Sequence, residues 1–318
     1  MNFLEQLKRH TQVVADTGDF QTMKRFKPID ATTNPSLIYA ATQKSEYKDI
    51  LYRALEYGRK SGANSSEKLA ETLDMLAVLF GVEILNIVPR RVSTEVDARL
   101  SFDKEGSIEK ARKLIGLYED NGISREKILV KLASTWEGIK AAEELDKEGI
   151  HCNLTLLFSF AQAVACAEAG VQLISPFVGR IYDWHKKERG VEYIPGAEDP
   201  GVYSVQKIFH YYKKFGYETE VMGASFRNTG EIIELAGCDL LTISPKLLGE
   251  LESMDGELKV RLDAAASMSM DLQKIHLEQK DFLWLHNEDA MGVEKLAEGI
   301  RKFTVDLVKL EELIAKEI

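Results

Sequence analysis

Cysteine, net positive charge and long apolar runs are all scarce in this chain, and each shortage excludes a class of protein. The 318 residues hold three cysteines (Cys152, Cys166 and Cys238) without CxxC spacing, which indicates reduced core thiols in a cytosolic protein. The formal net charge is −10 with no basic stripe, which argues against nucleic acid or anionic membranes as partners. The most apolar run, 154–167, is broken by polar residues and is too short to span a bilayer. The first ten residues lack the apolar core of a signal peptide and predict an amphipathic helix.

Several sequence motifs of common enzyme classes are also missing. Neither GxSxG nor HExxH occurs, and the six histidines show no metal-ligand spacing, so we expect no hydrolase triad and no zinc site. No strand-like run is followed by GxGxxG, which counts against a doubly wound Rossmann sheet, the main structural alternative to a barrel.

Short β-like runs alternate with amphipathic helical segments along the whole chain. The runs are residues 13–16, 26–33, 92–97, 128–133, 151–158, 173–178, 220–226 and 239–243. Eight βα units of this spacing predict a (β/α)8 TIM barrel with additional N- and C-terminal helices. No internal repeat, low-complexity tract or linker divides the chain, so we expect residues 1–318 to form one domain.

Helix start signals support this alternation. Residues 134–137 (STWE) and 159–162 (SFAQ) have the pattern of capping boxes, and Asp199-Pro200 reads as an N-cap followed by proline at the first helical position. The polar stretch 182–201 is expected to be a surface excursion beside the sixth strand. Residues 287–318 are expected to form one or two structural helices packed against the barrel.

Lys131 is the most informative residue, because it lies within the apolar run 128–133 that is predicted to be a buried strand. Burial removes water from the ammonium and favours the neutral amine, which can attack a carbonyl group and form a Schiff base. A lysine that bends out to solvent or pairs with a carboxylate explains the strand alone equally well.

Polar side chains recur on the other strands at the same parity as Lys131, since residues two apart share a face. They are Asp30, Thr32 and Asn34; Ser93, Glu95 and Asp97; His151, Asn153 and Thr155; Ser175 and Phe177; Ser225 and Arg227; and Asp16 at the end of the first strand. In a barrel these groups would meet at the carboxyl ends of the strands, where active sites of this fold are built. A purely structural interior would carry valine, isoleucine and leucine, so we predict a functional cleft.

Some of these residues have structural explanations that remain open. Asn34 could be the N-cap before Pro35, and Asp16 could close an Asx-turn. Glu95 is more telling, because an unpaired buried carboxylate is costly; its natural partners are Lys131 or a bound water.

Arg180 and Arg227 each follow a strand end, where exposure to solvent is the usual fate of an arginine. Together with Ser225 they could instead bind a phosphate group. Because the chain is acidic overall, an anionic substrate would have to be attracted by such a local cluster.

Five segments resemble the conserved motifs of transaldolases, most closely those of the long bacterial and eukaryotic type. The segments are residues 31–37 (ATTNPSL), 128–138 (ILVKLASTWEG), 153–158 (NLTLLF), 174–180 (ISPFVGR) and 222–228 (MGASFRN). The resemblance implies a class I aldolase barrel with its Schiff-base lysine on the fourth strand. It further implies a cytosolic homodimer of the pentose phosphate pathway that uses neither a metal nor an organic cofactor.

The reaction implied by this resemblance moves a dihydroxyacetone unit from sedoheptulose 7-phosphate to glyceraldehyde 3-phosphate, giving erythrose 4-phosphate and fructose 6-phosphate. Lys131 would form the imine, Asp16 would exchange the C4 hydroxyl proton, and Glu95 would position a water together with Thr155. The residues expected to contact substrate are Thr32, Asn34, Asn153, Thr155, Ser175, Phe177, Arg180, Ser225 and Arg227. Arg180, Ser225 and Arg227 would bind the phosphate.

Two alternatives remain. A fructose 6-phosphate aldolase would release free dihydroxyacetone. Those lyases are shorter and usually carry Gln and Tyr at the positions where this chain has Glu95 and Phe177. A non-catalytic barrel that only binds sugar phosphates would have no use for Lys131, Glu95 and Asp16 together.

Overall fold

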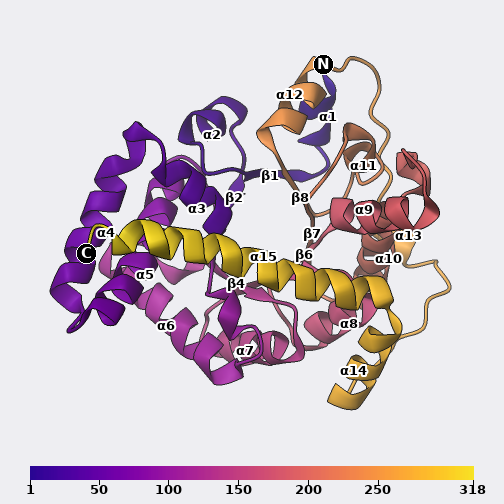
Figure 1. Cartoon of the computed structure of the whole chain (residues 1–318). Coiled ribbons are helices and arrows are strands. Elements are labelled where there is room, and N and C mark those ends of the chain that lie inside the picture. The colour runs from indigo at the N-terminus through magenta and orange to yellow at the C-terminus, as the bar shows by residue number, and fades with distance from the viewer.

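Eight parallel strands form a closed barrel in the computed structural model, which describes all residues 1–318 (Figure 1). The strands are β1 (Gln12–Asp16), β2 (Asp30–Thr32), β3 (Val92–Glu95), β4 (Ile128–Ala133), β5 (Cys152–Leu157), β6 (Leu173–Pro176), β7 (Glu220–Gly223) and β8 (Leu240–Ile243). Their order around the barrel is their order in the sequence, and β1 closes the sheet against β8. The predicted TIM barrel is therefore confirmed.

Helices surround the barrel and extend the chain at both ends. They are α1 (Phe3–Leu7), α2 (Phe20–Phe26), α3 (Pro35–Thr42), α4 (Lys48–Ser61), α5 (Ser65–Leu85), α6 (Lys104–Asp120), α7 (Trp136–Asp146), α8 (Phe160–Glu168), α9 (Val178–Arg189), α10 (Pro200–Phe215), α11 (Thr229–Ile233), α12 (Pro245–Ser253), α13 (Ala264–Ser267), α14 (Gln279–Glu288) and α15 (Ala290–Ala315). Short 3-10 turns are η1 (Ser45–Tyr47), η2 (Ala98–Leu100), η3 (Arg125–Lys127) and η4 (Gly196–Glu198). None of these helices has the length and apolar character needed to cross a membrane.

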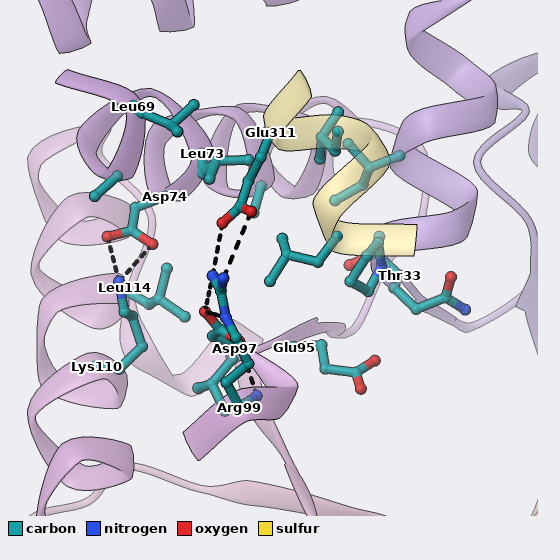
Figure 2. A pocket seen from close by; sticks show the side chains of 18 of the residues that line it. Thr33, Leu69, Leu73, Asp74, Glu95, Asp97, Arg99, Lys110, Leu114 and Glu311 are labelled. Atoms are coloured by element: carbon teal, nitrogen blue, oxygen red, sulfur yellow. Dashed lines mark hydrogen bonds and ion pairs between the residues drawn. The ribbon is translucent and has the colours of Figure 1, made fainter. Parts of the chain in front are cut away.

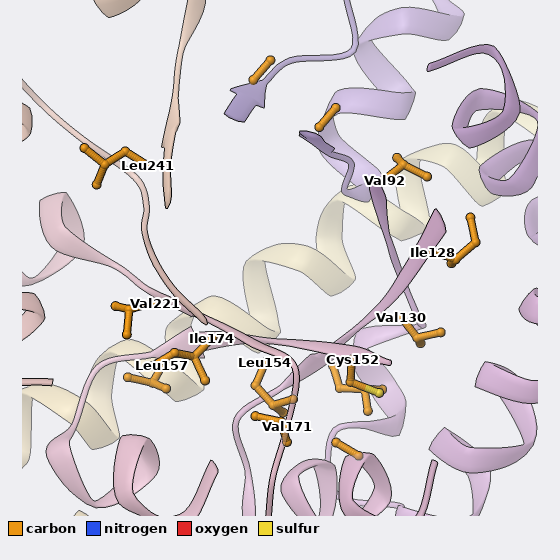
Figure 3. Packing of buried hydrophobic residues seen from close by; sticks show 14 of the residues in the cluster. Val92, Ile128, Val130, Cys152, Leu154, Leu157, Val171, Ile174, Val221 and Leu241 are labelled. Atoms are coloured by element: carbon orange, nitrogen blue, oxygen red, sulfur yellow. The ribbon is translucent and has the colours of Figure 1, made fainter. Parts of the chain in front are cut away.

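The outer face of the sheet packs against the helices through small and branched apolar side chains (Figure 3). On β4, Ile128 and Val130 belong to this outer core, whereas Leu129, between them, belongs to a separate cluster. Alternation along the strand therefore separates the two faces, as the pleat requires. The three cysteines are free and buried, as predicted.

The barrel interior is built in layers. A small apolar cluster forms its middle from five residues, each on a different strand: Val14, Leu129, Leu173, Met222 and Leu240. Four polar residues each follow a member of this cluster by two positions and therefore share its inward face, nearer the carboxyl end: Asp16, Lys131, Ser175 and Thr242. The apolar layer thus forms the floor on which the polar groups lie.

Asp30 lies at the opposite end of the barrel, and its predicted place in the cleft is wrong. Its carboxylate accepts hydrogen bonds from Arg91 Nε and Nη2 at 3.2 and 3.0 Å, and Arg91 also pairs with Glu220 at 2.7 Å. Asp30 is paired with Val14 in the β1–β2 register, two residues before the pair of Asp16 and Thr32. Parity fixes the face of a strand but not the depth along the barrel, so Asp30 closes the amino end.

His151 and Asp97 are likewise outside the cleft. His151 precedes β5 and its Nδ1 lies 3.0 Å from Asp146 Oδ1, while Asp97 caps η2 and pairs with Arg99. His151 lies just before the start of β5 and Asp97 just after the end of β3, where the backbone no longer alternates.

Two predicted element boundaries also differ. Residues 26–29 do not extend β2, because Phe26 ends α2 and Lys27 adopts a left-handed φ of 48° as its C-cap. The helix after β4 is capped by Thr135 rather than Ser134, whose hydroxyl instead donates to the carbonyl of Thr155 at 2.8 Å. The capping box at Ser159 and the N-cap at Asp199 are confirmed.

Residues 182–189 are helical, so the surface excursion predicted for 182–201 is wrong in its first half. Helix α9 runs from Val178 to Arg189, and Ile181 and Tyr182 lie on its buried face. The charged residues that suggested a loop occupy the outer face of an amphipathic helix.

The C-terminal segment does pack against the barrel, as expected, chiefly through the long helix α15. Figure 1 shows α15 crossing the barrel, from α14 to the α4–α5 side. Gly299 makes this approach possible, because a Cβ there would lie 2.6 Å from the side chain of Leu156. Leu156 itself has a left-handed φ of 55° at an irregularity of β5. The helix and the distorted strand are therefore fitted to each other.

Candidate active site

Lys131 and Glu95 form an ion pair between neighbouring strands. They stand opposite each other in the β3–β4 register, and Lys131 Nζ donates to Glu95 Oε2 at 3.1 Å. Their side chains are only 7% and 6% exposed. Burial raises the pKa of Glu95, and the nearby positive charge of Lys131 opposes that rise. The partner inferred for Glu95 from the cost of burying a carboxylate is therefore confirmed.

Asp16 lies at the carboxyl end of β1 and points into the barrel. Thr32 Oγ1 donates to Asp16 Oδ1 at 3.3 Å, and the two residues are paired in register. Burial raises the pKa of Asp16, while the charge of Lys131 and the Thr32 hydrogen bond oppose it. The Asx-turn alternative is wrong, since Thr17 Oγ1, not Asp16, accepts from the backbone N–H of Asp19.

Asn153 is held by serines on the two strands that flank β4 and β5. Ser175 Oγ donates to Asn153 Oδ1 at 2.6 Å, and Asn153 Nδ2 donates to Ser93 Oγ at 3.0 Å. These bonds fix which end of the amide faces each neighbour. Thr155, two residues further on, has a buried hydroxyl without a hydrogen-bond partner in the chain. A buried polar atom of this kind is available to a ligand or a water.

A cavity of about 90 Å³, called here the central pocket, opens between these groups. Its lining residues are Asp16, Thr32, Asn34, Lys131, Thr155, Ser175, Phe177, Arg180, Met222, Ala224, Ser225, Thr242 and Phe303. All the predicted site residues line it except Glu95, Asn153 and Arg227. Asn34 also caps α3 by accepting from Leu37 N at 3.0 Å, so its structural role and its position in the pocket coexist.

Phe303 is one of four lining residues that the sequence did not reveal. It comes from α15, and its ring centroid lies 5.7 Å from Lys131 Nζ and 5.5 Å from the Arg180 guanidinium. In the sequence it is one of many apolar residues at helical spacing, which are typical of any packed helix. Met222, Ala224 and Thr242 were missed for the same reason: nothing local marks them.

Arg180 is held by aromatic rings rather than by acids. Its guanidinium lies 4.8 Å from the ring centroid of Phe177 on one side and near Phe303 on another, and it forms no ion pair or hydrogen bond within the chain. Burial lowers the pKa of Arg180. An arginine that is oriented by π-contacts and retains its N–H donors suits a bound anion.

Arg227 lies beside the central pocket rather than in its wall. Its Nη2 and Nε donate to Asp183 Oδ2 at 2.7 and 3.0 Å, and its Nη1 donates to Ser225 Oγ at 3.3 Å. Ser225 has a left-handed φ of 63°, which costs energy in a non-glycine residue and is often found at ligand sites. Gly179 allows this loop to approach α9, since a Cβ there would lie 2.1 Å from the Ser225 carbonyl.

The ionisable groups suit covalent rather than metal-dependent chemistry. A buried amine stands next to one carboxylate and shares its pocket with another; the guanidinium group of Arg180 lies in the pocket wall and that of Arg227 lies beside it. No group of three or more His, Cys, Asp or Glu side chains could hold a metal ion. The arrangement can bind a carbonyl compound that carries an anionic group, form an imine with it, and move protons at neighbouring carbons.

Comparison with known proteins places this site in a family. A model of the family described as Transaldolase/Fructose-6-phosphate aldolase matches residues 13–314. A transaldolase from Homo sapiens is 60% identical over 316 residues, which cover 99% of this chain and 94% of the relative. A transaldolase from Thermosynechococcus vestitus is 59% identical over 100% of this chain and 82% of the relative, and a probable transaldolase from Drosophila melanogaster is 59% identical over 99% and 95%. The chain therefore belongs to the transaldolase/fructose-6-phosphate aldolase family.

Proposed function

We propose that this protein is a transaldolase that moves the dihydroxyacetone unit of sedoheptulose 7-phosphate to glyceraldehyde 3-phosphate. The products are erythrose 4-phosphate and fructose 6-phosphate. The observation that carries the proposal is the buried Lys131–Glu95 pair, set beside a pocket that also holds Asp16 and the unpaired Arg180. Transaldolases about 60% identical over nearly the whole chain support the same activity.

Lys131 is the nucleophile in this mechanism. Its neutral amine attacks the C2 carbonyl of the ketose, and loss of water gives a protonated imine that withdraws electrons from the C3–C4 bond. Glu95, 3.1 Å from Nζ, can take the ammonium proton before attack and return it as water leaves. Its raised pKa makes this exchange easier, because the carboxylate then holds a proton more strongly than an exposed glutamate does.

Asp16 is the base for carbon–carbon cleavage. It removes the proton from the C4 hydroxyl, so that the aldehyde leaves and a three-carbon enamine stays on Lys131. Ser175 and Asn34, which line the pocket, hold hydroxyl groups of this fragment, and Asn153 orients Ser175 by accepting its hydrogen bond. Phe177 and Phe303 limit water near it, which protects the enamine until an acceptor aldehyde arrives.

The proposal is tested by asking whether the three-carbon unit is transferred or released. With fructose 6-phosphate and erythrose 4-phosphate, we expect sedoheptulose 7-phosphate to form at least about tenfold faster than free dihydroxyacetone appears without an acceptor. Borohydride with fructose 6-phosphate alone should add one three-carbon fragment to the peptide that contains Lys131. Release as fast as transfer would instead identify the aldolase alternative, and an unlabelled protein would remove the Schiff-base mechanism.

The arginines are expected to bind the phosphate with unequal strength. Arg180 is the better placed, because it lines the central pocket and has no competing acid, whereas Arg227 must share its donors with Asp183. Hydrogen bonds to a charged group are worth roughly 1.5–3 kcal/mol, so Arg180→Ala should raise the KM for fructose 6-phosphate by about one to two decades. Arg227→Ala should act in the same direction but less strongly.

The controls separate phosphate binding from structural damage. Both arginine variants should change the weak reaction with unphosphorylated fructose much less than they change the reaction with fructose 6-phosphate. Asp183→Asn should release Arg227 and lower or preserve the KM, since it removes the competing carboxylate. Equal losses with phosphorylated and unphosphorylated substrates would show that these arginines stabilise the fold instead.

We further propose that residues 1–318 form one catalytic domain that works as a homodimer in the cytosol. The sequential barrel order and the wrapping of α15 across it support a single unit, and three reduced, buried cysteines suit a reducing compartment. The mass measured by sedimentation at micromolar concentration tests the dimer.

A further inference from the structure

A second cavity reaches the catalytic carboxylate from outside the barrel. This side cavity has a volume of about 280 Å³ and lies between α5, α6 and α15 (Figure 2). Its outer part includes Ser66 and Ala70, which are exposed on α5, and its inner part includes Glu95 and Val96 at the end of β3. Glu95 lines this cavity but not the central pocket, so its carboxylate is open to a different space from the one that receives the sugar.

The walls of the side cavity are polar enough to hold water. Arg99 bridges Asp97 and Glu311, with Nη2–oxygen distances of 2.6 Å to each, and Lys110 pairs with Asp74 at 2.7 Å. Figure 2 shows both ion-paired groups on the cavity wall, with the Glu95 side chain nearby. Cavities of this size lined only by apolar groups stay dry, but roomy ones with several polar partners hold ordered water.

A small void connects the side cavity with the nucleophile. Its volume is about 10 Å³, near the least space that one water needs. Glu95, Val96 and Asp97 line both this void and the side cavity, while Lys131 and Phe303 line both the void and the central pocket. The three spaces therefore adjoin one another: Glu95 lies between the side cavity and the void, Lys131 lies between the void and the central pocket, and Asn34 borders both the side cavity and the central pocket.

We propose that the side cavity is the route by which water reaches and leaves the imine on Lys131, separate from the entrance used by the sugars. The inference rests on the proposed transaldolase activity. Attack of the amine on C2 gives a carbinolamine, whose C–O bond breaks as the hydroxyl leaves with a proton as one water; hydrolysis runs the same step backwards. A sugar phosphate fills the central pocket of about 90 Å³, so the route past Glu95 stays open while the front is occupied.

Separate routes explain how one lysine can hold a three-carbon fragment between two substrates. The first aldehyde must leave and the second must enter through the central pocket. Water admitted through the void meets Glu95 before it meets the imine, so hydrolysis depends on the protonation of that carboxylate and not on which sugar occupies the front.

The test narrows the side cavity from its exposed rim and follows carbonyl oxygen exchange. Each cycle of imine formation and hydrolysis replaces the C2 oxygen of fructose 6-phosphate with oxygen from the solvent, which mass spectrometry detects in ¹⁸O-water. Ala70→Trp should slow this enzymatic exchange, and kcat for transfer, by about threefold to tenfold while leaving the KM for fructose 6-phosphate unchanged. The matched control is Ala40→Trp, an exposed alanine of α3 that does not line the cavity.

A second matched pair guards against a folding defect in Ala70→Trp. Ser66 lines the side cavity and its neighbour Ser65 does not, although both are exposed at the start of α5. Ser66→Trp should slow exchange and Ser65→Trp should not. Equal exchange rates within both pairs, or a raised KM with unchanged exchange, would overturn the separate route. If the unaltered protein forms no borohydride-trapped adduct at all, the proposed function fails instead.

Discussion

Lys131→Met is expected to abolish turnover and the borohydride-trapped adduct together. The variant loses the only amine in the central pocket, and removal of a covalent nucleophile typically lowers kcat by on the order of 10⁴-fold or more. Methionine has a similar length and no charge, so it fills the same space. The measurement is transfer from fructose 6-phosphate to erythrose 4-phosphate, with mass spectrometry of the borohydride-treated protein. Residual turnover accompanied by a label on another lysine would contradict the assignment.

The same variant should lose stability as pH rises, because Glu95 keeps its buried position without its partner. Burial raises the pKa of Glu95, and removal of the opposing charge of Lys131 raises it further. A carboxyl whose folded-state pKa is raised costs no stability below its unfolded pKa, and the cost grows as pH climbs towards the folded value. Breaking a buried pair in this way costs about 3–5 kcal/mol.

Urea unfolding from acidic to neutral pH measures this effect. The free energy of unfolding of Lys131→Met should fall relative to the unaltered protein across that range. The double variant Lys131→Met/Glu95→Gln removes the titrating group. Its free energy of unfolding should therefore differ from that of the unaltered protein by an amount that does not change with pH. A pH-independent loss in the single variant would mean that the packing of methionine, and not the unpaired carboxylate, is responsible.

Asp16→Ala is expected to stop the reaction one step later than Lys131→Met. The imine with the intact ketose should still form, but cleavage should slow by about 10²–10⁴-fold because the base for the C4 hydroxyl is gone. Borohydride with fructose 6-phosphate should therefore trap the six-carbon sugar phosphate on Lys131 instead of the three-carbon fragment. Glu95→Gln is the contrasting variant, since it should slow formation of either adduct.

The pH dependence of the unaltered protein gives a second test of Asp16. The base must be ionised to accept a proton, and burial raises its pKa above the ordinary value for aspartate. The rate of cleavage should therefore fall on the acidic side at a higher pH than the titration of an exposed aspartate would produce. Near-normal cleavage in Asp16→Ala, with no six-carbon adduct, would remove this residue from the mechanism.

The sequence alone predicted the barrel because its signals are local. Short β-like runs between helical segments marked all eight strands, and short-range capping patterns at Ser159 and Asp199 marked helix starts that the structure confirms. Lys131 stood out for the same reason: a charged residue inside an apolar run conflicts with its own neighbours. The cost of burying a carboxylate left Lys131 or a bound water as partner for Glu95, and the register of β3 and β4 brings Lys131 to it.

Predictions failed where depth or the last residues of an element mattered. Asp30 has the parity of the cleft residues, but its position at the start of β2 places it at the amino end beside Arg91. Phe26 has the apolar character of a strand, but it ends α2, where Lys27 reverses the chain with a positive φ. Both errors arise because the two-residue repeat reports only which face a side chain takes.

Only the tertiary structure decided how groups far apart in the chain meet at the site. Arg227 is neutralised by Asp183, 44 residues away, and Arg180 is instead left free between aromatic rings. Phe303 reaches Lys131 because α15 crosses the barrel, and the side cavity is enclosed where that same helix meets α5 and α6. A sequence encodes periodicity and capping within a few residues, but the contacts that enclose the central pocket and the side cavity form only when separate helices pack against the finished sheet.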